Sequence, residues 1–371
     1  MKMNKLTYLF IIPSSVQMYS GTGRVIKDWI RNTREIFDFY ILMDVGNVEN
    51  YRITKQICES YGVKLITGIP TIIPGCNDFM IENINSVCDS LQFDYIEIVS
   101  WANAATNLAA VLSLPKKSEI IFTPHYQPIN SIPNYHKYFS IEPFFEEIIQ
   151  RVNYIFADSP WERDFFIGKG VPEERVHYIP LGVSSIFTNF DIVKEKNNHS
   201  KVINVSDWRE IRKRNELLVE TLKKVFNKNN NIDFLLIGKS ISTFKVPKNF
   251  NNNIRLYEDI TDSELKNLYS ESSVYICLSD YEAFCLPIAE ALCSGCFAII
   301  NKTPILESIY SNLPGIVFAN NYDTDKVAEL IIEKCNKAEL DQKRIIANSA
   351  RNFFNSEKLT KIKLSILLNR L

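Results

Sequence analysis

The sequence lacks the features that identify membrane-spanning, secreted and nucleic-acid-binding proteins. No apolar run approaches the ~20 residues that a membrane-spanning helix needs. Residues 6–13 follow two lysines as in a signal peptide, but the run is short and has no small-residue cleavage site, so we interpret it as a first strand. The formal net charge is only −1, which gives no reason to expect a nucleic-acid partner. We therefore expect a cytoplasmic protein that contacts a membrane at most peripherally.

Histidine is scarce, and the cysteines do not form a recognisable framework. The eight cysteines are scattered through apolar segments, as is typical of free buried thiols in a reducing compartment. Cys293 and Cys296 form a Cys-x-x-Cys pair, but no second pair or histidine cluster accompanies it. No Asp-x-Asp or histidine cluster lies at an expected strand end either. We therefore expect no metal ion and no other cofactor.

Strand-like and helix-like segments alternate along the 371 residues. Such alternation is typical of parallel sheets covered by helices on both faces, so we predict an α/β fold. Strands are expected at residues 6–12, 39–44, 64–69, 95–100, 119–123, 154–158, 176–179, 201–205, 233–237, 254–256, 274–278, 297–301 and 315–318. Helices are expected at residues 24–34, 47–61, 78–91, 102–112, 140–152, 213–226, 261–270, 286–293 and 324–334, with terminal helices within 339–371.

The length of the chain suits two domains. The alternating pattern breaks into polar, Asn- and Lys-rich sequence around residues 182–198, where we place the linker. We therefore predict two Rossmann-like domains at residues 1–183 and 184–352, followed by a terminal helix at 353–371.

The most informative stretch is residues 280–295, which follows an apolar strand-like run. Pro287 marks a helix start, which places Glu282 on the loop leaving the strand and Glu290 about one turn into the helix. Both side chains can then point toward a ligand above the loop. Carboxylates accept hydrogen bonds from sugar hydroxyls, and the N–H groups of a helix start suit a phosphate. The simpler alternative is a surface-loop Glu plus a Glu favoured by the helix dipole.

The two acids, with seven residues between them that include Phe284-Cys-Leu-Pro287, resemble the E-x(7)-E signature of retaining GT-B glycosyltransferases of the family-4 type, the group 1 glycosyl transferases. The resemblance implies two Rossmann-like domains that face each other across a cleft, with a last helix that crosses back to the N-terminal domain. It also implies metal-independent transfer of a sugar, with retention, from a nucleotide-diphosphate sugar to a glycan or lipid-linked acceptor, as in polysaccharide biosynthesis.

The resemblance also assigns roles to individual residues. Glu282 would hold a hydroxyl of the donor sugar, and Glu290 would accept from the ribose hydroxyls. The backbone N–H groups of Phe284, Cys285 and Leu286 would stabilise the departing diphosphate. On this view Glu282→Gln abolishes transfer while the melting temperature hardly changes.

The basic segment at residues 205–215 follows the first strand of the second domain, where family members carry a Gly-Arg pair and then a Lys. This chain has Ser206-Asp207 instead, followed by several competing bases. Arg209 is our first choice for the Arg role and Lys213 or Arg214 for the second cation, although Arg212 also competes for contact with the diphosphate. Arg suits bidentate phosphate contacts and Lys acts as a point charge. A solvated basic loop is the alternative.

Weaker signals concern three glycines, one histidine and one acid. Gly21 and Gly23 form a Gly-rich turn after the first strand, where the family approaches the donor phosphate, and Gly238 ends a later strand near the expected nucleotide. His125 follows a strand, where the family often has a His close to the donor sugar, and its imidazole could bond a hydroxyl. Glu307 corresponds to a Glu that many members carry on a loop. Ordinary turns and polar caps explain all of these equally simply.

Basic residues also recur along one face of the first predicted helix. This stripe could meet anionic lipid head groups or a lipid-diphosphate acceptor, although a solvated face is the simpler interpretation. The expected C-terminal helix is also basic, with the same simple alternative, through Lys358, Lys361, Lys363 and Arg370. The stripe consists of Arg24, Lys27, Arg31 and Arg34.

Two other functions remain open at this point. The altered Ser206-Asp207 is compatible with a non-catalytic regulatory or scaffolding subunit that binds a nucleotide sugar. A GT-B sugar-nucleotide epimerase would share the fold and the donor but convert it without an acceptor.

Overall fold

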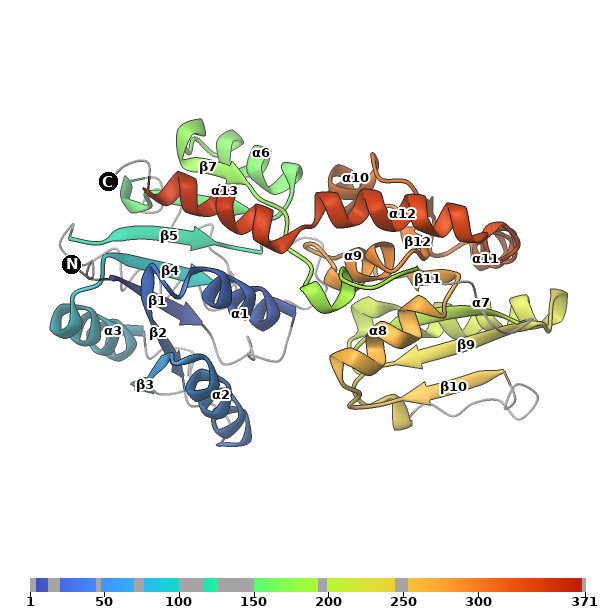
Figure 1. Cartoon of the computed structure of the whole chain (residues 1–371), viewed down its shortest axis with the longest axis horizontal. Helices are drawn as coiled ribbons and strands as arrows, with labels where there is room; N and C mark the ends of the chain where they lie inside the picture. Colours follow the sequence, from blue (N-terminus) through green and yellow to red (C-terminus); the bar gives the residue numbers. More distant parts are fainter. Residues whose placement is uncertain are drawn as a thin grey trace. The chain divides into compact units, whose positions relative to one another are not determined.

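The computed structural model of the chain describes residues 5–12, 21–44, 48–69, 77–99, 117–125, 150–192, 199–243 and 253–368. The chain forms two compact units, Met1–Pro180 with Glu357–Leu371 and Leu181–Ser356. Each unit is an α/β structure with one parallel sheet (Figure 1), so the predicted fold class is confirmed. The helix expected at 102–112 and most of the one expected at 140–152 lie outside the described residues.

The N-terminal unit has a seven-stranded sheet in the order β3-β2-β1-β4-β5-β6-β7, and all its strands are parallel. The order reverses between β1 and β4, as in a doubly wound sheet. All five residues of β4 are buried, including Glu97, so the strand has no exposed polar face. The strands are β1 (Leu6–Ile12), β2 (Phe37–Asp44), β3 (Lys64–Ile69), β4 (Tyr95–Val99), β5 (Glu119–Thr123), β6 (Tyr154–Ala157) and β7 (Val176–Tyr178). The helices include α1 (Gly21–Thr33), α2 (Val48–Tyr61), α3 (Asn77–Leu91), α6 (Pro160–Gly168) and α13 (Ser356–Leu368).

The C-terminal unit repeats this plan with six parallel strands in the order β10-β9-β8-β11-β12-β13. Helix α11 packs on α7 and α12 packs on α9. The strands are β8 (Ser200–Val205), β9 (Ile232–Ile237), β10 (Ile254–Tyr257), β11 (Val274–Cys277), β12 (Phe297–Asn301) and β13 (Ile316–Ala319). The helices are α7 (Asn215–Lys228), α8 (Asp262–Ser270), α9 (Leu286–Cys293), α10 (Pro304–Tyr310), α11 (Thr324–Lys337) and α12 (Leu340–Phe353).

Helix α10 occupies a segment for which we predicted a loop. Thr303 caps this helix by accepting from the Leu306 N–H, and Pro304 is its first residue. Both are ordinary helix-start signals. Glu307 therefore lies on a helix, where it pairs with Lys302 at 3.0 Å.

The last helix, α13 (red in Figure 1), belongs to the N-terminal unit and is anchored there by a buried ion pair. Lys363 Nζ lies 2.8 and 2.9 Å from the two carboxylate oxygens of Glu97 on β4. Glu97 also accepts hydrogen bonds from the hydroxyls of Tyr8 and Thr123. The Lys363 ammonium lies 4.7 Å from the centre of the Trp29 ring. Lys363, which we expected on a solvated face, thus has a side chain that is only 14% exposed.

The segment that we predicted as a linker is partly folded into the C-terminal unit. The units divide after Pro180 and after Ser356 rather than at residues 183 and 352. Phe187 is fully buried, and its ring lies 6.0 Å from that of Tyr269, centre to centre. Burial of this apolar ring ties the segment to the unit, while residues 193–198 lie outside the described part of the chain.

Candidate functional site

Two loops of the C-terminal unit meet where its strand order reverses. In a doubly wound sheet a crevice opens there, beyond the carboxyl ends of the strands. The reversal lies between β8 and β11, which are neighbours in the sheet. The loops that leave these strands, residues 206–214 and 278–285, carry the basic segment and Glu282.

Glu282 is held by two cations from the facing loop. Lys213 Nζ lies 2.5 Å from Glu282 Oε1, and Arg212 Nη1 lies 2.9 Å from Oε2. Arg212 also donates to the Tyr281 carbonyl at 3.2 Å and pairs with Glu210 at 2.7 Å. Glu282 is only 5% exposed, so solvent screens these contacts little. We call Arg212, Glu282 and Lys213 the ion triad.

The ion triad is fully charged at neutral pH. Burial raises the pKa of the Glu282 carboxyl, but Arg212 and Lys213 outweigh burial and lower that pKa to about 2. Burial lowers the pKa of Lys213, and Glu282 outweighs it, so the pKa is raised. Because Glu282→Gln would leave two buried cations without a counter-charge, we now expect it to reduce stability as well as activity. This replaces the sequence-based expectation of a nearly unchanged melting temperature.

The helices that follow the two loops begin in an unusual way. Helix α7 begins after Arg214, with φ 53°, and α9 begins after Cys285, with φ 62°. A left-handed residue other than glycine costs about 1–2 kcal/mol, and such strain concentrates at functional sites. Neither residue caps its helix through its side chain, and α12 also lacks such a cap, whereas α6, α8, α10 and α11 each have a Ser, Thr or Asp cap. The Leu217 and Ile288 N–H groups donate to backbone carbonyls and Pro287 has no N–H, so only the remaining first-turn N–H groups suit a phosphate.

We expected Arg209 to contact the phosphate, but the structure turns it toward an acid. Its Nε and Nη2 donate to the two carboxylate oxygens of Asp207 at 3.1 and 2.8 Å. The Arg209 side chain is 64% exposed. The hydrogen bond from Arg209 lowers the pKa of Asp207, so the carboxylate keeps this partner at neutral pH. Arg212, which we had not preferred, therefore fits the Arg role better by position.

Arg214 is the other cation that the structure separates from Glu282. Its Nε lies 2.5 Å from Asp280, and its Nη2 donates to the Tyr322 hydroxyl at 2.9 Å. A short 3₁₀ turn, Ile211–Lys213, and the left-handed backbone of Arg214 decide which bases face inward. A base-rich loop after the strand could be predicted from the sequence, but these two backbone features could not.

Glu290 lies on α9 as predicted, but its carboxylate faces another side chain. The Tyr269 hydroxyl on α8 donates to Glu290 Oε2 at 3.4 Å, and Glu290 is 1% exposed. A ribose could reach this carboxylate only after a rearrangement. Its proposed contact with the donor stays a prediction.

The start of α9 is fixed by a tyrosine from α10. The Tyr310 hydroxyl donates to the carbonyls of Phe284 and Cys285 at 3.0 and 3.4 Å. Leu286 is the first residue of the helix and Pro287 the second. The backbone whose N–H groups we assigned to the diphosphate is therefore held in a defined orientation.

The three glycines singled out in the sequence have different structural reasons. Gly21 and Gly23 lie within the first turn of α1, which begins earlier than we predicted, rather than in a turn before it. At Gly238 the backbone has φ 150°, and a Cβ atom would lie 1.6 Å from the Ser206 carbonyl oxygen. Close approach of the Ser206 backbone therefore explains the glycine at position 238 without a ligand.

His125 lies just past β5 in the N-terminal unit and pairs through Nδ1 with Asp158. Burial lowers the pKa of His125, but the charge and hydrogen bond of Asp158, with Glu162 and Glu97, outweigh it and raise the pKa. The pairing fixes the ring, so Nε2 is the nitrogen left for another partner. Its proposed contact with the donor sugar stays a prediction.

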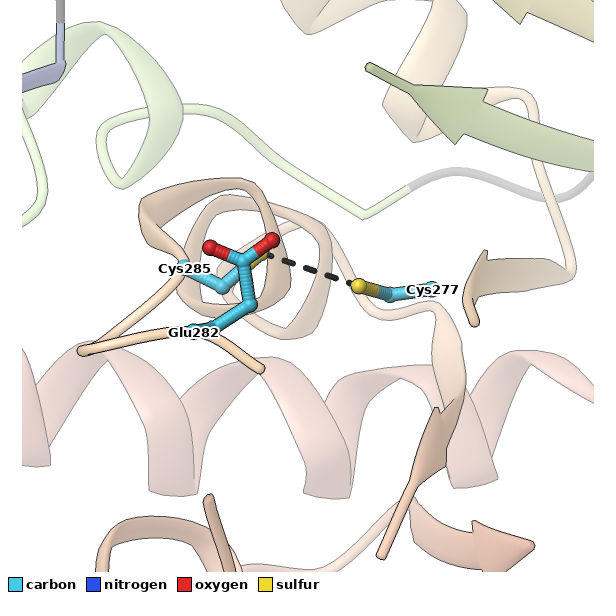
Figure 2. A group of neighbouring side chains, drawn as sticks. All are labelled: Cys277, Glu282 and Cys285. Atoms are coloured by element: carbon cyan, nitrogen blue, oxygen red, sulfur yellow. Dashed lines mark hydrogen bonds between the residues drawn. The ribbon is translucent and has the colours of Figure 1, made fainter. Parts of the chain in front are cut away.

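One group of side chains in the described part of the chain could share a metal ion. The ligand atoms of Cys277, Glu282 and Cys285 lie within 4.8 Å of one another (Figure 2). From the sequence we interpreted both cysteines as ordinary buried thiols. Their proximity could not be predicted, because Cys277 ends a strand and Cys285 precedes a helix.

The basic stripe on α1 is partly paired within its own unit. Arg31 Nη1 lies 2.9 Å from Asp28, and Arg34 Nε lies 3.7 Å from Glu35. Among the described residues, no helix has both the length and the apolar character needed to cross a membrane. Membrane contact through Arg24, Lys27, Arg31 and Arg34 stays a prediction.

The C-terminal unit resembles a known family in sequence. Residues 187–352 match the sequence model of the family described as glycosyl transferases group 1. This segment contains all members of the ion triad, although it covers less than half of the chain. No curated protein matches the chain.

Solved structures resemble the chain over nearly its whole length. A glycosyltransferase from Rickettsia africae matches with a TM-score of 0.74 and 19% identity over 99% of both chains. HepE from Anabaena, in complex with UDP and glucose, matches with a TM-score of 0.75 and 11% identity over 99% of this chain and 100% of that one. A putative UDP-N-acetylglucosamine 2-epimerase from Listeria monocytogenes matches with a TM-score of 0.62 and 11% identity over 98% and 96%. At these identities the likeness establishes the fold, and the predicted fold of two Rossmann-like α/β domains, as in GT-B proteins, is confirmed. The cleft between the two domains stays a prediction.

Proposed function

We propose that the chain is a retaining glycosyltransferase that takes a nucleotide-diphosphate sugar as donor. The observation that carries this proposal is the ion triad at the strand-order reversal of the C-terminal unit. It lies within the segment that matches the glycosyl transferase family, and it combines an acceptor for sugar hydroxyls with donors for a diphosphate.

The cations would stabilise the leaving group. When the bond between the anomeric carbon and the phosphate oxygen breaks, the electron pair stays on the diphosphate. Lys has three N–H donors and Arg has five, so Lys213 and Arg212 can hold Glu282 and phosphate oxygens together. The uncapped starts of α7 and α9 add backbone N–H groups. Losing one such fixed donor typically costs about 100-fold or more in rate.

Glu282 would act on the sugar side of the breaking bond. Its carboxylate accepts a hydrogen bond from a donor-sugar hydroxyl and stabilises the positive charge that develops at the anomeric carbon. For retention, the acceptor hydroxyl attacks from the face that the diphosphate leaves, and the departing phosphate oxygen takes its proton. No separate protein base is needed on this path, and Arg212 and Lys213 supply the charge that a metal ion would otherwise provide.

We propose a glycan or lipid-linked acceptor and a cytoplasmic location. The acceptor would be lipid-linked if the basic residues of α1 meet anionic head groups. Arg31 and Arg34 already pair with acids, which weakens this contact.

The test begins with thermal shifts of the purified chain against a panel of nucleotide sugars. The donor that raises the melting temperature is then incubated with the protein, and released nucleoside diphosphate is measured with and without candidate acceptors. We expect slow donor hydrolysis alone and faster release with an acceptor. Conversion of the donor to its epimer without release of nucleoside diphosphate would instead identify an epimerase. The putative epimerase from Listeria is similar to this chain in fold. Binding with neither reaction, across the acceptors tried, would favour a regulatory subunit.

A further inference from the structure

Two thiols lie close together beside Glu282, because the chain turns back between β11 and α9. Cys277 is the last residue of β11, and Cys285 is the left-handed residue before α9. Their Sγ atoms lie 3.9 Å apart, and the Glu282 carboxylate lies beside them (Figure 2). A tetrahedral zinc ion with Zn–S bonds of about 2.3 Å separates two sulfurs by about 3.8 Å. The observed spacing of the two sulfurs therefore needs almost no adjustment to hold such an ion.

The ligand types also suit a thiophilic cation. Zinc binds thiolate sulfur and carboxylate oxygen, and a site with three protein ligands leaves a fourth position open. Ser279 Oγ lies 3.4 Å from Cys277 Sγ, where it can orient the ligand by a hydrogen bond. All three ligand residues are less than 10% exposed, so little solvent reaches their ligand atoms.

The ion and the ion triad make opposing demands on Glu282. Each Glu282 oxygen already has a cation beside it, Lys213 at Oε1 and Arg212 at Oε2. A divalent cation bound to either oxygen would repel the cation at that oxygen. Glu282 can therefore serve either the cation with the two thiolates or the ion triad with the donor, but not both.

We propose that Cys277, Cys285 and Glu282 form an inhibitory site for a zinc-type divalent cation, which competes with the nucleotide-sugar donor. Binding releases the two thiol protons and forms two S–metal bonds and one O–metal bond, without any change of oxidation state. The binding site itself does not depend on the proposed function, whereas the competition rests on it.

The site is tested by titrating the reduced, metal-free full-length protein with Co²⁺. Cobalt substitutes for zinc and reports thiolate ligation through an absorption band in the near ultraviolet. We expect one Co²⁺ per chain, displaced by Zn²⁺, with a thiolate band that Cys277→Ser and Cys285→Ser each weaken. Cys58→Ser is the matched control, because Cys58 is also a buried free thiol but lies on α2. Absence of the band in the wild-type protein would overturn the site. This result does not depend on whether any variant folds.

The competition is tested by titrating the donor found in the thermal-shift panel with and without Zn²⁺. We expect the apparent affinity for the donor to fall at least tenfold with Zn²⁺ and to recover with a chelator. The Cys277→Ser variant should lose most of this effect. Unchanged donor affinity in the zinc-loaded protein would overturn the competition. If no nucleotide sugar binds at all, the proposed function fails while the cobalt result stands by itself.

Discussion

Each unit has a buried carboxylate in or just after the strand at which the sheet order reverses, which is β4 in the N-terminal unit and β11 in the C-terminal unit. The surroundings of the two carboxylates differ. Glu97 lies within β4, and its oxygens accept from Tyr8, Thr123 and Lys363 of the same unit. Glu282 lies beyond the end of β11 on a loop, and its partners are cations from the loop after β8. The strands β4 and β11 occupy the same place in the two sheets.

The difference separates a carboxylate that holds the fold from one that is placed to bind. A side chain within a strand is surrounded by neighbouring strands and helices, so its partners are fixed by the fold. A side chain beyond the carboxyl end of the strand lies where such sheets bind ligands. The comparison therefore predicts that disturbing Glu97 affects stability alone, whereas disturbing Glu282 affects both stability and catalysis.

The largest effect is expected from Lys363→Met. The substitution removes the cation but keeps the length of the side chain, so Glu97 is left buried without its ion pair. Breaking a buried ion pair in this way typically costs about 3–5 kcal/mol. Urea unfolding measures the loss, and turnover per folded molecule should stay within about twofold, since Glu97 has no role in binding the donor.

Lys361→Met is the matched control on the same helix. Lys361 is exposed, so its replacement should change the free energy of unfolding by less than about 0.5 kcal/mol. If both variants unfold at the same urea concentration as the wild type, Glu97 does not hold α13 in place.

Glu282→Gln should have the next largest effect. We expect kcat/KM to fall about 100-fold, or roughly 2.7 kcal/mol in the transition state, because the negative charge beside the anomeric carbon is lost. The melting temperature should also fall, because Arg212 and Lys213 lose their counter-charge. Activity has to be measured well below that temperature, and wild-type turnover in the folded variant would remove Glu282 from the site.

Replacing arginines on the loop after β8 sharpens the comparison further. Arg212→Ala removes a charged donor from the ion triad, and we expect nucleoside diphosphate affinity to fall about tenfold. Arg209→Ala is the control, because Arg209 is mostly exposed and paired with Asp207, and it should change affinity less than about twofold. Titration calorimetry measures both. The reverse order of effects would restore Arg209 to the role that the sequence first indicated.

The smallest effect concerns His125 and depends on pH. The pKa of His125 is raised in the folded chain, chiefly by Asp158 against the opposing effect of burial. The stabilisation is therefore fully present below the unfolded value of about 6.5 and is lost as the pH rises through the folded pKa. Wild type should exceed His125→Gln in stability more at about pH 6 than at about pH 9 by urea unfolding. Asp158→Asn should abolish this dependence, and a difference that grows with pH would contradict the assignment.

Much of the fold could be predicted from the sequence because strands and helices leave local signals. The bounds of β1, β3, β5, α9 and β12 match the predicted ranges, since each is a run rich in apolar residues near polar, Gly or Pro residues. Helix α10 was missed although Thr303 and Pro304 signalled its start. We had instead followed the resemblance to family members that carry a Glu on a loop at the position of Glu307.

The site was predicted only in part, because its details depend on contacts between distant residues. The position of Glu282 beyond a strand could be predicted from the chain around it. The choice of Arg212 over Arg209 depends on the left-handed Arg214 and on Asp207, and burial of Lys363 depends on Glu97, which lies 266 residues away. No local pattern encodes either outcome.

The central claim is that a nucleoside diphosphate binds at the loops after β8 and β11, beside the ion triad. Hydrogen exchange measured by mass spectrometry, with and without the nucleoside diphosphate that gives the largest thermal shift, tests this most directly. The account predicts that protection increases in residues 206–214 and 278–290 and that Glu282→Gln reduces the effect. Protection confined to other parts of the chain, with these two segments unchanged, would contradict it.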